Sequence, residues 1–212
     1  MDLRCFIAIS IPAQLQRNIG ECIEILKKHD ADIKWVVPEN LHFTLKFLGN
    51  TPDVLLPKIR ESLTVVVSTY KPFYIKLYGT GVFPNKTYPR VIWAGLQDAD
   101  GMKNLQEGVE RSMAFLGFKS ENREFNPHLT LGRVRSRRGM IMFVKELETF
   151  EEKEFGIVPV DRIFLMKSEL KPKGPEYTCV YDIPFGCDTF SSIENKNMSS
   201  ELWRSDDEQG QS

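Results

Sequence analysis

Residues 42–45 read His-Phe-Thr-Leu, and residues 128–131 read His-Leu-Thr-Leu. The pattern His-x-Thr-Leu therefore occurs twice in a chain of 212 residues that contains only three histidines. A single histidine in a strand is usually structural, but a repeat of this kind is hard to attribute to chance. Because histidine titrates near neutral pH, two such residues indicate a site that transfers protons in two directions.

Both repeats lie in apolar stretches that predict β-strands, residues 41–48 and about 125–134. Alternate side chains of a strand project from the same face. His42 and Thr44 are therefore expected to point together, as are His128 and Thr130, while the apolar residues between them enter a core. Two such strands side by side would bring two imidazoles and two hydroxyls into one cleft.

The remaining apolar periodicity predicts alternating strands and helices. Further strands are expected at residues 3–10, 33–37, 73–82, 90–96, 155–170 and 177–183. Helices are expected from Pro12 to about 28, from about 51 to 67, from a cap at Asp100 to about 116, and over 140–152. This order is typical of an α+β protein and suggests two similar lobes.

Charge is unevenly distributed along the chain. The formal net charge is −1, of which residues 191–212 contribute −3, so residues 1–190 carry +2. Such a weakly basic body does not favour strong nonspecific binding to duplex nucleic acid. We expect one bilobal domain over residues 1–190 and a polar, acidic, disordered tail over residues 191–212.

Cysteine usage and hydropathy indicate a cytoplasmic protein. The four cysteines show no C-x-x-C spacing and are expected to be buried free thiols: Cys5, Cys22, Cys179 and Cys187. The apolar run at residues 5–9 is too short to cross a bilayer, and we see no secretory signal. No membrane association is expected.

The paired residues suit an in-line displacement at a phosphate. One neutral imidazole removes a proton from the attacking hydroxyl, and the other, protonated, gives a proton to the leaving oxygen. Threonine hydroxyls can donate to the phosphate oxygens, and an arginine can offset their charge. Arg133 follows His128 by five residues, an odd spacing, so this role requires a bulge, a twist or a strand end.

Other interpretations remain open. A zinc site would use imidazole ligands, but no cysteine or carboxylate stands at ligand spacing from either histidine of the repeat. The chain could be a nucleotide- or RNA-binding module that uses the same cleft without turnover, or an interaction protein that uses its acidic tail. His29 is explained by surface exposure, and Arg137 and Arg138 by a solvated loop.

Longer strings around the repeats carry a family resemblance. They are Trp35-Val36, Pro38-Glu39-Asn40-Leu41-His42-Phe43-Thr44-Leu45-Lys46-Phe47-Leu48-Gly49, Pro127-His128-Leu129-Thr130-Leu131-Gly132-Arg133-Val134-Arg135, Arg90-Val91-Ile92-Trp93-Ala94-Gly95-Leu96, and Leu165-Met166-Lys167-Ser168-Glu169-Leu170 with Gly174 and Tyr177. Here the chain resembles the two-histidine (2H) phosphoesterase superfamily, in its RNA 2′,3′-cyclic phosphodiesterase branch, also called the 2′-5′ RNA ligase family. The resemblance spans residues 3 to about 185.

This resemblance implies an α+β fold of two lobes, each with an antiparallel sheet, and an active-site cleft between them. It implies an enzyme of RNA processing that hydrolyses a 2′,3′-cyclic phosphate, on an RNA end or a nucleoside, to a 2′-phosphomonoester without metal or cofactor. His42 would be the proton donor and His128 the proton acceptor, while Thr44, Thr130 and Arg133 would hold the phosphate. The reverse reaction, 2′-5′ RNA ligation, should be minor because water is the abundant nucleophile. We expect a monomer.

Overall fold

The structure is a computed structural model that describes residues 1–121, 123–172 and 174–186. The acidic tail, the last residues of the expected 1–190 domain and Cys187 lie outside these ranges. The elements are β1 (Asp2–Ser10), α1 (Ala13–Lys27), β2 (Ile33–Trp35), a 3₁₀ turn η1 (Pro38–Asn40), β3 (His42–Pro52), a 3₁₀ turn η2 (Asp53–Leu55), α2 (Leu56–Val67), β4 (Phe73–Phe83), β5 (Val91–Gln97), α3 (Asp100–Phe115), β6 (Leu129–Val134), α4 (Met140–Glu148), β7 (Glu154–Val160), β8 (Arg162–Lys171) and β9 (Gly174–Pro184).

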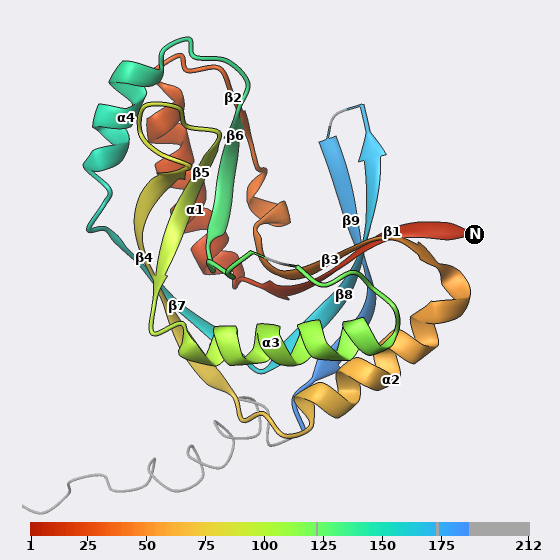
Figure 1. Ribbon diagram of the computed structural model, residues 1–212. Coiled ribbons are helices and arrows are strands. Elements are labelled where there is room, and N and C mark those ends of the chain that lie inside the picture. The colour runs from red at the N-terminus through yellow and green to blue at the C-terminus, as the bar shows by residue number, and fades with distance from the viewer. Residues whose placement is uncertain (122, 173, 187–212) are drawn as a thin grey trace, which may run out of the picture.

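Two antiparallel sheets form the two lobes (Figure 1). One has four strands in the order β3-β1-β8-β9, and the other has five in the order β2-β6-β5-β4-β7. Helices α2 and α3 pack on the four-stranded sheet, whereas α1 and α4 pack on the five-stranded sheet. The predicted α+β class with an antiparallel sheet in each lobe is therefore confirmed.

The lobes are not consecutive pieces of chain. The four-stranded sheet takes β1 and β3 from the first quarter of the sequence and β8 and β9 from its C-terminal part. Between β1 and β3 the chain visits the other lobe, where β2 pairs with β6. The backbone N–H of Val36 continues this pairing by donating to the carbonyl of Leu131 at 2.8 Å. The first repeat is thus tied to the strand that carries the second.

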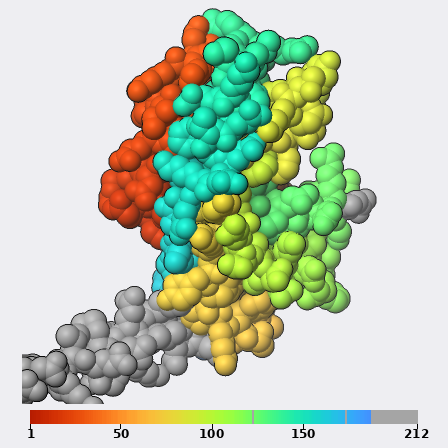
Figure 2. Space-filling view, turned by 90° about the vertical axis from the view of Figure 1, so that its left-hand side faces the viewer, coloured from red at the N-terminus to blue at the C-terminus, as the bar shows by residue number. Residues whose placement is uncertain are grey.

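The apolar faces predicted for the helices enter the core. In α1, the residues expected at helical spacing are all buried: Leu15, Ile19, Cys22, Ile23 and Leu26. In α3 the buried apolar face consists of Met102, Leu105, Val109 and Met113. Figure 2 shows α1 and α4 side by side on the outer face of the five-stranded lobe, in agreement with their contact. His29, two residues beyond the end of α1, contacts α4, where its Nε2 lies 3.4 Å from Oε2 of Glu146.

Several predicted boundaries are wrong. The strand at residues 41–48 does not end at Gly49 but passes through it to Pro52, because glycine readily adopts the φ of +69° found there, which other residues rarely adopt. Residues 155–170 form two strands in different sheets, separated only by Asp161. Asp100 is the first helical residue of α3 and not its cap.

One expectation for the cysteines is also wrong. Cys179 is exposed, not buried.

Candidate active site

The two histidines of the repeat have the same hydrogen bond. Nδ1 of His42 lies 2.7 Å from the carbonyl oxygen of Asn40, and Nδ1 of His128 lies 2.8 Å from the carbonyl oxygen of Asn126. A carbonyl can only accept, so Nδ1 carries the proton in both rings. In the neutral form, each imidazole therefore has its free lone pair on Nε2, which is the atom left to exchange a proton with a ligand.

Aromatic side chains pack against both imidazoles. The ring centroid of His42 lies 4.9 Å from that of Phe6 and 5.2 Å from that of Tyr177, and the contact with Tyr177 is edge to face. The ring of His128 lies 5.0 Å from Phe83, also edge to face. Burial lowers the pKa of His42 below its ordinary value of 6.5, although the bond to the Asn40 carbonyl opposes this shift. The imidazole of His42 is therefore mainly neutral in the free protein at pH 7.

Each repeat contains a β-bulge at its leucine. In β3, Thr44 pairs with Ala8 and Lys46 with Ile7, so Leu45 has no partner on β1. In β6, Thr130 pairs with Trp93 and Gly132 with Ile92, so Leu131 has no partner on β5. An extra residue reverses the alternation of faces beyond it. The similarity of the two repeats therefore extends from sequence to backbone geometry.

The bulge at Leu131 brings Arg133 to the face of β6 that carries Thr130. Arg133 pairs with Val91 and Thr130 pairs with Trp93, and these two partners point to the same side of β5. Leu129 and Leu131 are completely buried on the other side. Because Arg133 follows His128 by an odd number of residues, it needed an irregularity to reach this face, and the bulge at Leu131 provides it.

The positive charge of Arg133 acts on Tyr177, a residue of β9 in the other lobe. Burial raises the pKa of Tyr177, and the positive charges of Arg133 and Arg4 act in the opposite direction. Arg133 thus lies close enough to Tyr177, which packs against His42, for its positive charge to lower the pKa of the tyrosine. It also pairs directly with Lys34 on β2, an unfavourable arrangement of like charges. Among the described residues neither cation has a carboxylate within ion-pair distance, so an anion would be well accommodated here.

Other predicted features are distributed as follows. The strands β3 and β6 contact each other. Arg137 lies 4.8 Å over the ring of Tyr88, and Arg138 pairs with Asp30 at 3.6 Å. Both are exposed, as expected for a solvated loop.

Within the described ranges, no group of three or more potential metal-ligating side chains comes together. No described helix is both long and apolar enough to cross a membrane.

Two contributors to the site were missed by the sequence analysis. Asn40 and Asn126 both precede their histidine by two residues, so the repeat is Asn-x-His-x-Thr-Leu. The shared asparagine was the signal that could have revealed them, although it is its backbone carbonyl that orients each imidazole. Asn40 is held by its side chain, whose Nδ2 donates to the carbonyl of Pro175 at 3.0 Å.

Comparison with known proteins agrees with this architecture. The family described as LigT like Phosphoesterase matches residues 9–93 and 96–177. A protein of Methanothermobacter thermautotrophicus named RNA 2′,3′-cyclic phosphodiesterase is 36% identical over 178 residues, 84% of this chain and 96% of its own length. A protein of the same name from Methanocaldococcus jannaschii is 37% identical, over 84% of this chain and 98% of that protein.

Solved structures share the fold. The structure of TT0787 of Thermus thermophilus matches with a TM-score of 0.73 and 30% identity, over 87% of this chain and 98% of that one. The structure of E. coli LigT complexed with 3′-AMP matches with a TM-score of 0.67 and 24% identity, over 87% and 99% of the two chains, and indicates the fold alone. The extent of the family match and the identity to its relatives show that this chain belongs to the LigT-like phosphoesterases.

Proposed function

We propose that this protein hydrolyses the 2′,3′-cyclic phosphate at an RNA end, or on a nucleoside, to a 2′-phosphomonoester. The observation that carries the proposal is the matched hydrogen bonding of His42 and His128, which leaves Nε2 of each imidazole for proton transfer. Relatives that are 36–37% identical over 84% of the chain bear the name of this activity. RNA ends and small cyclic nucleotides are the expected substrates.

In the proposed reaction, water attacks the phosphorus opposite the 3′ oxygen. Nε2 of His128 accepts a proton from the water as the new P–O bond forms, and the P–O3′ bond breaks. His42, as the imidazolium, donates its Nε2 proton to O3′, which leaves as the 3′-hydroxyl. Exchange with solvent then restores both protonation states.

The threonines and the arginine are assigned to the phosphate. Thr44 lies on the same face of β3 as His42, and Thr130 lies in β6, two residues after His128. No hydrogen bond occupies either hydroxyl within the described part of the chain. They would donate to the non-bridging oxygens, while Arg133 balances the charge that grows there. Because His42 is mainly neutral in the free protein, its role as donor requires the anionic substrate to raise its pKa on binding.

One assay tests the proposal. Purified protein is incubated with a nucleoside 2′,3′-cyclic phosphate in excess EDTA, and the product is identified by phosphorus NMR. The expected product is the 2′-monophosphate. The 3′-monophosphate would contradict the assigned leaving group, and loss of activity that zinc restores would favour a metal mechanism. Tight binding without turnover would favour the alternative, a nucleotide-binding module that uses the same residues.

A further inference from the structure

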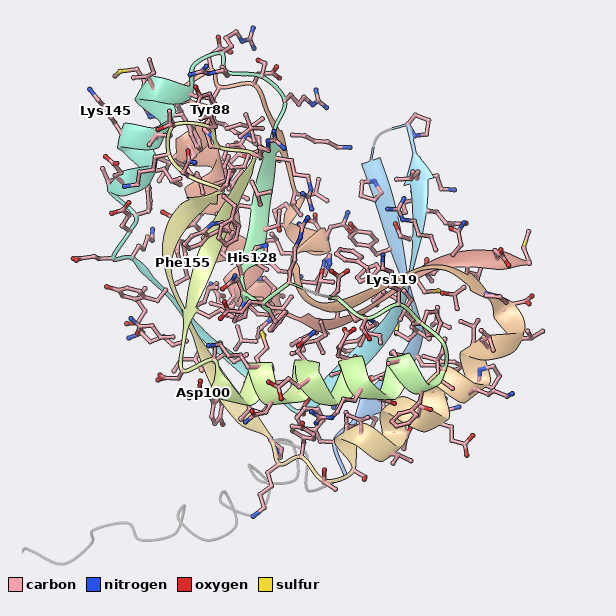
Figure 3. All side chains as sticks on the ribbon, viewed as in Figure 1. Tyr88, Asp100, Lys119, His128, Lys145 and Phe155 are labelled. Carbon is pink, nitrogen blue, oxygen red and sulfur yellow. The ribbon has the colours of Figure 1, made fainter. Side chains whose placement is uncertain are left out.

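A cavity of about 280 Å³ lies beyond the first repeat, between the later part of β3 and the segment that follows α3. Its lining includes Phe47, Phe118, Lys119, Ser120 and Arg123, together with Leu48 and Glu121. Figure 3 labels Lys119 and His128 on the segment that crosses the front of the molecule from α3 to β6. The same connection thus forms one wall of the cavity and leads into the second histidine.

Phe47 reaches this cavity because of the bulge at Leu45. Phe47 pairs with Phe6, and Thr44 pairs with Ala8, two residues that share a face of β1. His42, Thr44 and Phe47 therefore form one row along the site face of β3, in which Phe47 lies roughly 10 Å beyond Thr44 at ~3.3 Å per residue. Phe47 is 61% exposed, which is unusual for a phenylalanine in a strand.

The opposite wall is fixed from beneath the sheet. The same bulge directs Lys46 to the buried face, where its Nζ donates to Oε1 of Glu110 at 2.6 Å and to the carbonyl oxygen of Lys119 at 2.8 Å. Oε1 of Glu110 also accepts the backbone N–H of Glu121 at 2.9 Å. These bonds hold the backbone of the wall in place before any ligand arrives, which lowers the entropic cost of binding.

The side chains of this cavity suit single-stranded RNA. Sites for single strands combine an aromatic platform, on which a base stacks, with cations that contact the backbone. Phe47 provides an exposed ring, and Lys119 and Arg123 provide two cations that have no ion-pair partner in the described part of the chain. The carboxylate of Glu121 is the single acid of the lining, so positive charge prevails.

We propose that this cavity is a subsite for the nucleotide that precedes the cyclic phosphate end of an RNA strand. Phe47 stacks on its base, and Lys119 and Arg123 contact the linking phosphodiester. The substrate class is accordingly a short or long RNA chain in preference to a mononucleotide. This inference rests on the proposed function, since it extends the site occupied by the cyclic phosphate.

The test compares two substrates, a nucleoside 2′,3′-cyclic phosphate and a tetraribonucleotide that ends in the same group. We expect the protein to show a higher kcat/KM for the tetranucleotide. Phe47→Ala should reduce the ratio of the two kcat/KM values about tenfold, given the usual contribution of one stacked base. Arg123→Ala should also reduce this ratio, because it removes a cation that contacts the linking phosphodiester. Phe47→Trp should retain the ratio. Phe115→Ala is the matched control, because Phe115 is 91% exposed on α3 and lines a different cavity.

The outcomes separate the subsite from the reaction. A protein without preference for the tetranucleotide, or a Phe47→Ala variant that keeps the ratio while both rates fall, would overturn the subsite and leave the proposed function standing. If neither substrate is hydrolysed, the proposed function fails, and the subsite is judged by fluorescence anisotropy of a labelled tetranucleotide. Binding that Phe47→Ala does not weaken would then overturn it.

Discussion

The Nζ atom of Lys46 lies 2.6 Å from Oε1 of Glu110, on the face of β3 opposite to His42 and Thr44. Lys46 is only 2% exposed, so its ammonium group is stabilised by this carboxylate and by the carbonyl of Lys119 and not by water. Lys46→Met leaves the largely buried carboxylate of Glu110 without its cation, with only the backbone N–H of Glu121 as a donor, and should lower the free energy of unfolding by about 3 kcal/mol. Urea unfolding measures the loss.

Two comparisons isolate the ion pair in that experiment. The double variant Lys46→Met/Glu110→Leu should be more stable than the single variant, because it removes the uncompensated charge. Lys27→Met breaks the exposed pair with Glu24 and should cost less than about 1 kcal/mol. A Lys46→Met variant no less stable than Lys27→Met would contradict the assigned role.

Loss of either imidazole should abolish most of the activity. His42→Ala and His128→Ala should each lower kcat by ~10²–10⁴-fold, the usual contribution of a positioned acid or base. The double variant should lose less than the product of the two factors, since both groups act in one displacement. His29→Ala is the matched control and should retain kcat. Thermal melts must show that the variants fold; a kcat within twofold of the parent would make the repeats structural.

A modified leaving group distinguishes the donor from the acceptor. A cyclic phosphate with sulfur in place of the 3′ bridging oxygen releases a thiolate, which needs no general acid. His42→Ala should therefore hydrolyse this substrate at a rate close to that of the unaltered protein, whereas His128→Ala should remain impaired. Steady-state kinetics on the two substrates give the result. Recovery of His128→Ala instead would reverse the two roles.

The lowered pKa of His42 should appear in the stability of the free protein. Below pH 6.5 the unfolded chain binds a proton at this position before the folded chain does, so folding is disfavoured as the pH falls from 6.5 toward the lower folded value. The contribution is constant above 6.5. The free energy of unfolding should therefore decrease less between pH 7.5 and 5.5 for His42→Gln than for the parent. Equal decreases in urea titrations would show that His42 is not desolvated.

The hydroxyls of the repeat should contribute less than the imidazoles. Thr44→Val and Thr130→Val keep shape and strand propensity but remove one donor to the phosphate, so kcat should fall by about 10–10³-fold. Arg133→Ala should mainly weaken the binding of substrate and of the 2′-phosphate product. Arg138→Ala is its control, because Arg138 is paired with Asp30. Product inhibition constants that do not change in Arg133→Ala would remove Arg133 from the site.

The sequence predicted those features that depend on local periodicity. Apolar spacing placed the helices and most strands, and alternation placed His42 with Thr44 on one face of β3. The second strand was predicted to start near residue 125, but β6 begins at Leu129, so His128 lies just before it. Alternation also showed that Arg133 needed an irregular strand to reach the site. The class of fold followed from the order of these elements together with the family resemblance.

Other features depend on contacts between distant residues, which periodicity does not contain. A leucine at a β-bulge is as buried and apolar as a leucine in a regular strand. The sequence therefore did not reveal that Leu45 and Leu131 form bulges. The break at Asp161 has no glycine directly beside it, and only the pairing of β7 with β4 and of β8 with β1 reveals it. The role of Asn40 is performed by its backbone carbonyl, so the asparagine shared by both repeats marked the position without indicating its function.

The interleaving of the two sheets sets the order in which the site can form during synthesis. β1 lies between β3 and β8, and β8 consists of residues 162–171. The sheet that carries His42 therefore remains incomplete until residue 171 has left the ribosome, long after His42 itself has emerged. Pairings of such high sequence separation form slowly, and strand edges stay unpaired meanwhile. A nascent chain truncated before residue 162 would contain both histidines but no finished lobe to hold the first.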